Sequence, residues 1–299
     1  MALIKKFNMK ILDKVFEYLD NKKNIKLLRS FGLVLSFISI AIIFDTFKKY
    51  ELNLNNFRLN VLLISFFLMI SSYVFFGFAW SKYINKNLGL EKRRSLIYWS
   101  YSNLGKYIPG LVGIPLLRIS QDNKVKSKNL FFGVIEEQIT PILILIPTSL
   151  ILLNIKLLDN IIISFCLVVS FCIFLLGFIY KKADLFSGIN SYVYSRIELF
   201  LGFMFQFGSI YFFCFESGLN EPATIAIQYT LASAMSLLII GSPAGIGIRE
   251  IILLQLTTNF ISNELILLVM VGVRTIYFIV DVVTGIFGLV GALLSDKYL

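Results

Sequence analysis

Charged side chains that interrupt long apolar runs are the residues of this sequence whose chemistry most needs an explanation. Arg274 and Asp281 lie within the last apolar run, Leu265–Leu294. A charge at the centre of a bilayer costs about 2.5–3.5 kcal/mol on insertion scales, so it usually has a partner or a task. The two residues are seven positions apart, about two turns along one helix face, which is too far for an easy direct pair. We therefore expect each to meet another segment, with these candidate partners: Arg118, Glu136, Glu137, Arg249 and Glu250.

The charges in apolar surroundings allow two interpretations that do not exclude each other. They form a structural network of ion pairs that holds the helices together, or they line a hydrophilic path or a headgroup site. The cations that would contact an anionic headgroup are Lys106, Arg118, Arg249 and Arg274. The acids that would balance this charge or accept a cationic group are Glu137, Glu250 and Asp281.

The stretch Tyr101–Arg118 lies in an apolar region but is unsuited to one straight helix. Pro109 and Pro115 lack a backbone donor and disfavour a helical conformation of the residue before them, and Lys106 adds a charge. Backbone that leaves the helix at membrane depth must be covered by protein or line a wet cavity. We interpret residues 95–119 as a broken or re-entrant segment, with an ordinary Pro-kinked span as the alternative. Basic residues on both flanks favour re-entry, because re-entry keeps both flanks on the cytoplasmic side.

A second interrupted stretch, Gly241–Glu250, repeats the order Pro, Gly, Gly and Arg, and we expect irregular structure near 241–260. The likeness indicates an internal repeat of two broken elements, or chance similarity between turns. A half-helix that starts within the membrane presents free backbone N–H groups to its neighbours. Glycine lets a ligand approach this backbone closely, and the planar guanidinium group of arginine matches the geometry of a phosphate. The two stretches therefore predict a site for a phosphate-bearing lipid headgroup, although the same geometry also serves to seal the two elements together.

The composition is typical of a polytopic helical membrane protein of the all-α class. Of 299 residues, 57% are hydrophobic and 15% are charged, and the mean hydropathy is +0.80. Soluble proteins carry about 25% charged residues. We expect one transmembrane domain over 27–299, with two interrupted segments and about seven spans of the roughly 20 residues that a crossing needs. The expected spans are 27–47, 59–80, 130–153, 161–180, 196–216, 222–240 and 265–294.

Several classes of function are excluded by residue types. The chain has no histidine, which removes His-based catalysis and His–metal sites. Its three cysteines, Cys166, Cys172 and Cys214, lie in apolar runs and indicate packing rather than disulfides or a metal site. The basic residues are spread over loops without a recognition motif, so nucleic acid is not expected as a partner. We expect no cofactor and no metal.

Residues 1–26 combine lysines with apolar residues at helical spacing, and we expect an amphipathic cytoplasmic or interfacial helix. A solvated charged helix is the alternative. The basic loops predict a cytoplasmic N-terminus. The abundance of Ile, Lys, Asn and Phe suggests a bacterial genome, so the membrane that we expect is the bacterial inner membrane. Trp80 and Trp99 fit an aromatic belt at segment ends, and Gly285 and Gly288 are small residues suited to close helix contact.

Three motifs together resemble a known family. They are SNLGKYIPGLVG with the following LLR between Ser102 and Arg118, the pair Glu137-Gln138, and SPAGIGIRE between Ser242 and Glu250. In their order and spacing they resemble the lysylphosphatidylglycerol synthase transmembrane-region family, whose flippase-like domain also forms the N-terminal part of the bacterial multiple peptide resistance factor. The resemblance covers most of the chain, and Gln138 departs from the arginine found there in many members.

The resemblance implies a lipid-translocating domain, and we expect a flippase or transporter of a phosphate-bearing lipid, either a phospholipid or a lipid-linked glycan. No aminoacyl-transferase domain is expected, because the chain ends at Leu299 just past the last apolar segment. The alternatives are a membrane-embedded lipid or glycan transferase and a non-catalytic scaffold for cell-surface polymer assembly, with a homo-oligomer or an envelope-biosynthesis protein as partner. Besides the charged residues above, the predicted substrate-binding residues are Tyr107, Pro109, Gly110, Pro243, Gly245 and Gly247.

Overall fold

The computed structural model has helices and no strand in the residues that it describes, which agrees with the predicted all-α class. The described residues are 59–107, 113–119, 127–154, 161–183, 195–238, 248–257 and 263–295. The predicted amphipathic helix at 1–26 and the first predicted span at 27–47 lie outside them.

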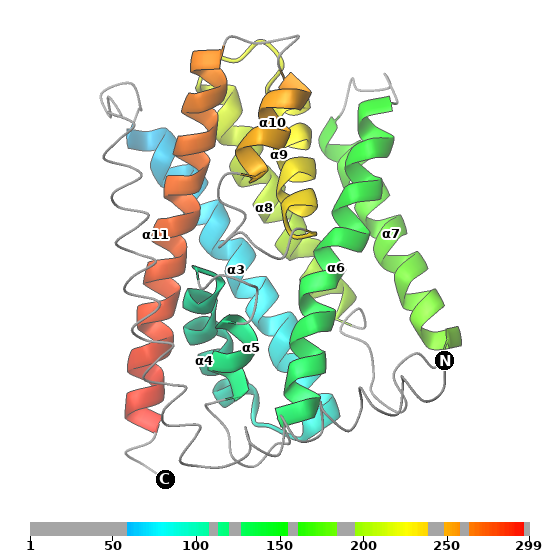
Figure 1. The fold of residues 1–299 in the computed structure, drawn as a ribbon, viewed down its shortest axis with the longest axis vertical. Coiled ribbons are helices and arrows are strands. Elements are labelled where there is room, and N and C mark those ends of the chain that lie inside the picture. Colours follow the sequence, from blue (N-terminus) through cyan, green and yellow to red (C-terminus); the bar gives the residue numbers. More distant parts are fainter. Residues whose placement is uncertain are drawn as a thin grey trace.

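Long helices run side by side along the length of the molecule (Figure 1). They are α3 (Leu59–Leu88), α6 (Ser127–Asn154), α7 (Ile161–Ala183), α8 (Arg196–Glu216) and α11 (Asn263–Ser295). Within the described part, four helices are long and apolar enough to cross a membrane: Leu59–Leu88, Asn129–Asn154, Arg196–Glu216 and Leu268–Ala292. This arrangement of apolar helices indicates a membrane protein.

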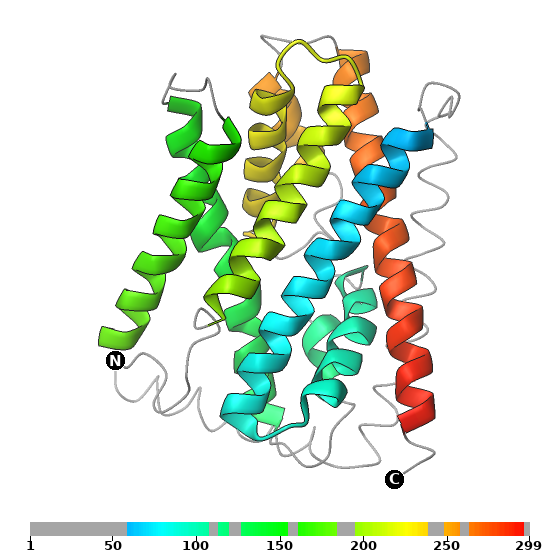
Figure 2. The same cartoon turned by 180° about the vertical axis from the view of Figure 1, so that it is seen from behind.

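The described residues of the first interrupted segment form two short α-helices and a 3-10 helix. These are α4 (Lys92–Ser102), η2 (Asn103–Tyr107) and α5 (Gly113–Ile119). In Figures 1 and 2 all three lie in the lower half of the bundle, with α4 packed between α3 and α11. The described helices of this segment therefore occupy one half of the bundle and do not run its full length. We call α4, η2 and α5 the lower hairpin.

The described part of the second interrupted segment, 248–257, lies in the opposite half of the bundle (Figure 1). There α9 (Pro222–Ser236) packs against α10 (Ile248–Thr257), and we call this pair the upper hairpin. Sequence analysis predicted a full span over 222–240, but α9 has only 15 residues, fewer than the roughly 17–25 that a crossing needs. Our seven-span count is therefore not confirmed.

Glycines allow the lower hairpin to pack closely. A Cβ atom on Gly105 would lie 2.5 Å from the carbonyl carbon of Gly113, so η2 and α5 touch backbone to backbone. A Cβ atom on Gly288 of α11 would lie 2.4 Å from the backbone nitrogen of Tyr101 in α4, and Gly285 faces a leucine of η2. These contacts confirm that Gly285 and Gly288 serve close helix packing.

Candidate functional site

Lys106 of η2 pairs with Asp281 of α11. The Lys106 Nζ atom lies 2.6 Å from Asp281 Oδ1 and donates to the Tyr73 hydroxyl at 2.8 Å, while that hydroxyl donates to Asp281 Oδ1 at 2.6 Å. The Asp281 carboxylate is almost fully buried, whereas a quarter of the Lys106 side chain is exposed. The pair fastens the lower hairpin to a long helix, and a buried carboxylate of this kind needs such a counter-charge.

Arg118 of α5 and Glu137 of α6 form a second buried ion pair. The Arg118 Nη1 atom contacts Glu137 Oε2, and its Nε atom donates to Ser102 Oγ at 2.8 Å. The guanidinium carbon lies 3.8 Å from the ring centre of Trp80, and Trp99 donates its indole N–H to Glu137 Oε1 at 2.6 Å. Arg118 is only 2% exposed. It therefore has the properties of a structural ion pair that joins the lower hairpin to α6.

The upper hairpin is also joined to α11 by an ion pair, between Glu250 of α10 and Arg274. The neighbouring Arg249 lies between two tyrosines. Its guanidinium carbon is 5.8 Å from the ring centres of both Tyr229 and Tyr277, and its Nη1 atom is 3.4 Å from the Tyr229 hydroxyl. Cation–π contacts of this kind hold the guanidinium group in place between the two rings.

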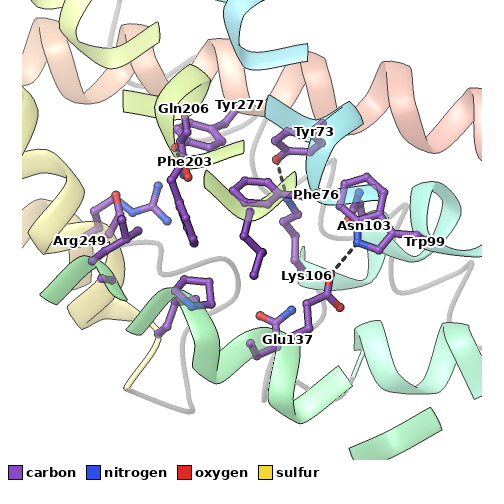
Figure 3. Close-up of a pocket in the computed structure, with 17 residues that line it drawn as sticks. Tyr73, Phe76, Trp99, Asn103, Lys106, Glu137, Phe203, Gln206, Arg249 and Tyr277 are labelled. Carbon is purple, nitrogen blue, oxygen red and sulfur yellow. Dashed lines mark hydrogen bonds between the residues drawn. The ribbon is translucent and has the colours of Figure 1, made fainter. Parts of the chain in front are cut away.

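A cavity of about 190 Å³ is lined by residues from both hairpins and from the long helices around them. Its lining comes from α3, α4, η2, α6, α8, α9, α10 and α11. Lys106, Glu137 and Arg249 are the charged residues in this lining. Figure 3 shows Arg249 on one side of the cavity and Lys106 on the other, with Phe203 between them in this view. The two hairpins thus bring cations from distant parts of the sequence to one interior space.

The predicted site residues fall into three groups in the structure. Those that line the cavity are Lys106, Glu137 and Arg249. Those that form ion pairs away from its lining are Arg118, Glu250, Arg274 and Asp281. Those that lie outside the described residues are Pro109, Gly110, Pro243, Gly245 and Gly247, while Tyr107 is described only as the end of η2.

The expectation that Arg274 and Asp281 meet other segments is correct, since each pairs with a residue from one of the hairpins. Glu250 was among the expected partners, but Lys106 was not. The aromatic-belt prediction for Trp80 and Trp99 is wrong, because these side chains are 2% and 5% exposed and contact Arg118 and Glu137 in the interior.

Sequence analysis missed most of the neutral residues of the cavity. Phe203 and Tyr277 lie in apolar runs, where aromatic residues are ordinarily core, and nothing in their spacing distinguishes them. Asn103 and Gln206 also lie in apolar surroundings, but their side chains are polar. A polar amide within an apolar run could have identified them as candidates. Within the described residues, no group of three or more acidic, cysteine or histidine side chains is placed to bind a metal ion.

The fold and the cavity define a helical membrane protein with a polar interior site between two helix hairpins. Comparison with known proteins adds no relative: no family model, no curated protein and no solved structure matches the chain.

Proposed function

We propose that this protein is a flippase or transporter that carries a phosphate-bearing lipid, a phospholipid or a lipid-linked glycan, across the bacterial inner membrane. The observation that carries this proposal is a cavity that is lined by Lys106 of the lower hairpin and Arg249 of the upper hairpin. Lipid tails need no protein path, because they stay in hydrocarbon. The headgroup does need one, since a phosphate in the bilayer interior is strongly disfavoured without charged and polar partners.

In this proposal the two hairpins are re-entrant elements that enter the membrane from opposite faces. Basic residues gather where α3 ends and α4 begins, at Lys82, Lys86 and 92–94, whereas acidic Glu216 and Glu221 mark the other end of the bundle. The preference of Lys and Arg for the cytoplasmic side supports a cytoplasmic position of the lower hairpin. Discontinuous helices that meet near the midplane are a common way to form a transport site.

The three ion pairs supply a frame for this site. Each joins a hairpin to a long helix: Lys106–Asp281, Arg118–Glu137 and Glu250–Arg274. Because these cations already meet acids, the frame lowers the cost of placing charge in the interior. The resemblance of the three motifs to the lysylphosphatidylglycerol synthase transmembrane-region family also supports the proposed flippase activity.

The proposal is tested with purified full-length protein in liposomes and lipids that carry a fluorophore on an acyl chain. The lipids are a phosphatidylglycerol, a phosphatidylethanolamine and a polyprenyl-phosphate hexose, and a membrane-impermeant reductant reports the fraction in the outer leaflet. We expect movement of at least one of these lipids, and a loss of about tenfold or more in Arg249→Gln, because a lost hydrogen bond to a charged group is worth about 1.5–3 kcal/mol.

Lys82→Gln is the matched control. It also removes one cation, but Lys82 is half exposed, pairs with Glu198 at 3.0 Å on the outside of the bundle and does not line the cavity. Exposed pairs of this kind contribute about 0–1 kcal/mol, so its transport should stay at the wild-type level. Folded wild-type protein that moves none of the lipids would contradict the proposal and would favour the transferase or scaffold interpretation.

A further inference from the structure

The cavity contains more hydrogen-bonding capacity than a phosphate group can use. Beside its charged residues it is lined by the amides of Asn103, Gln138 and Gln206 and by the hydroxyl of Ser233. A phosphate oxygen only accepts hydrogen bonds, whereas an amide or a hydroxyl both donates and accepts. A lining of this type fits a ligand whose groups also do both, and sugar hydroxyls are such groups.

Two of these neutral groups have buried atoms that the surrounding chain leaves unsatisfied. Asn103 is 6% exposed, and neither its Nδ2 atom nor the Ser233 Oγ atom has a hydrogen-bond partner among the described residues. An unsatisfied buried donor costs about 1–3 kcal/mol, so such groups usually serve a purpose. Asn103 belongs to the lower hairpin and Ser233 to the upper one, and both residues line the cavity. Neither atom is accessible in this structure, so each side chain turns toward the cavity when it binds a ligand there.

Aromatic rings form much of the remaining wall. Tyr73, Phe76, Trp99, Phe203 and Tyr277 all line the cavity. In the view of Figure 3, Phe203 and Phe76 lie between Arg249 and Lys106, with Tyr277 and Tyr73 above them and Trp99 beyond Lys106. The C–H faces of a sugar ring pack well on aromatic rings, while its hydroxyl groups point to polar side chains. The negative faces of the rings also hold the Arg249 guanidinium group at the edge of this wall.

The size of the cavity restricts the ligand further. Its volume of about 190 Å³ lies below the range of roughly 300–1,000 Å³ found for drug-sized ligands. It is enough for one monosaccharide ring or its phosphate end and too small for an oligosaccharide or a lipid tail.

From these observations we propose that the cavity binds a sugar phosphate, a single hexose-sized ring whose phosphate lies against Arg249. This inference rests on the proposed function only in taking the sugar phosphate to be the headgroup of a lipid. Arg249 holds the phosphate, Asn103 and Ser233 bind ring hydroxyls, and the aromatic wall packs against the ring.

Equilibrium binding to the full-length protein in detergent micelles tests this assignment, with isothermal titration calorimetry as the readout. The probes are glucose 1-phosphate, galactose 1-phosphate, glycerol 1-phosphate and inorganic phosphate. We expect one of the hexose phosphates to bind at least tenfold more tightly than glycerol 1-phosphate and inorganic phosphate. Equal affinity for glycerol 1-phosphate and both hexose phosphates, or no binding of either hexose phosphate, would overturn the sugar assignment.

Two variants locate the ring. Asn103→Leu and Ser233→Ala each remove one neutral hydrogen bond and should weaken hexose phosphate binding about two- to tenfold, without a change for inorganic phosphate. Ser149→Ala is the matched control, because Ser149 has a buried hydroxyl without a hydrogen-bond partner in the described chain but does not line the cavity. A hexose phosphate affinity that both variants leave unchanged would overturn the assignment, and Ser233→Ala alone decides it if Asn103→Leu does not fold.

The liposome lipids separate this inference from the proposed function. Movement of phosphatidylglycerol together with no preference for hexose phosphates would overturn the sugar assignment and keep the flippase. Tight binding of a free hexose phosphate, with no movement of polyprenyl-phosphate hexose or any other lipid, would keep the sugar site and overturn the flippase.

Discussion

The Lys106–Asp281 pair gives the most direct test of how the lower hairpin is held. Replacing Asp281 with Leu removes the acceptor of both Lys106 and Tyr73 and leaves a cation that is three-quarters buried. Breaking a buried pair by removing one partner costs about 3–5 kcal/mol. Because Lys106 keeps some contact with the cavity, we expect about 3 kcal/mol for Asp281→Leu. Lys106→Met leaves an almost fully buried carboxylate and should cost at least as much.

The double variant Lys106→Met/Asp281→Leu separates a charge interaction from simple loss of packing. Replacing both members of a buried pair with apolar residues is often neutral or better, so we expect the double variant to be more stable than either single variant. The remaining cost comes from Tyr73, whose hydroxyl loses two partners but still faces the cavity. The free energy of unfolding in mixed detergent micelles measures all four proteins. Additive losses, with the double variant least stable, would refute this account of the pair.

Two further perturbations test the packing of the lower hairpin. Gly105→Ala places a methyl group 2.5 Å from the backbone of α5 and should destabilise the protein by about 1–3 kcal/mol in the same unfolding assay. Gly208→Ala on α8 is the control, because no neighbouring atom lies within 4 Å of the new methyl group. Its free energy of unfolding should be unchanged or slightly higher. Arg118→Lys keeps the charge but loses the planar contact with Trp80 and one of the guanidinium contacts to its neighbours. We expect the free energy of unfolding to fall by about 1–3 kcal/mol. Unchanged stability would contradict the structural role of this arginine.

The sequence predicted the class of fold and the interrupted segments for physical reasons that are local. Prolines and glycines act on the backbone near them, so a break in the helix within 95–119 could be expected from these residues alone. The predicted count of seven spans is not confirmed, and one reason lies at 222–240. An apolar run of spanning length need not form one helix. Here α9 ends at Ser236 and packs against α10, and neither feature could be read from the apolar run itself.

The partners of the interior charges depended on contacts that the sequence does not contain. Spacing showed that Arg274 and Asp281 could not easily pair with each other, but the partner of Asp281 comes from 175 residues earlier in the chain. Arg118 illustrates the opposite limit: its type and position suited phosphate binding, yet α6 and Trp80 enclose it. The neutral wall of the cavity was the least predictable part, since Phe203 and Tyr277 have the spacing of ordinary core residues.

The central claim is that a lipid headgroup enters the cavity between the hairpins, and site-specific photo-crosslinking at adjacent residues tests it most directly. Leu237 lines the cavity, whereas Leu238 does not and is 56% exposed on the outside of the bundle. With p-benzoylphenylalanine at either position, we expect position 237 to capture one phosphate-bearing lipid selectively, and position 238 to capture lipids in proportion to their abundance in the membrane. The same unselective capture at both positions, or no lipid captured at position 237, would contradict the account.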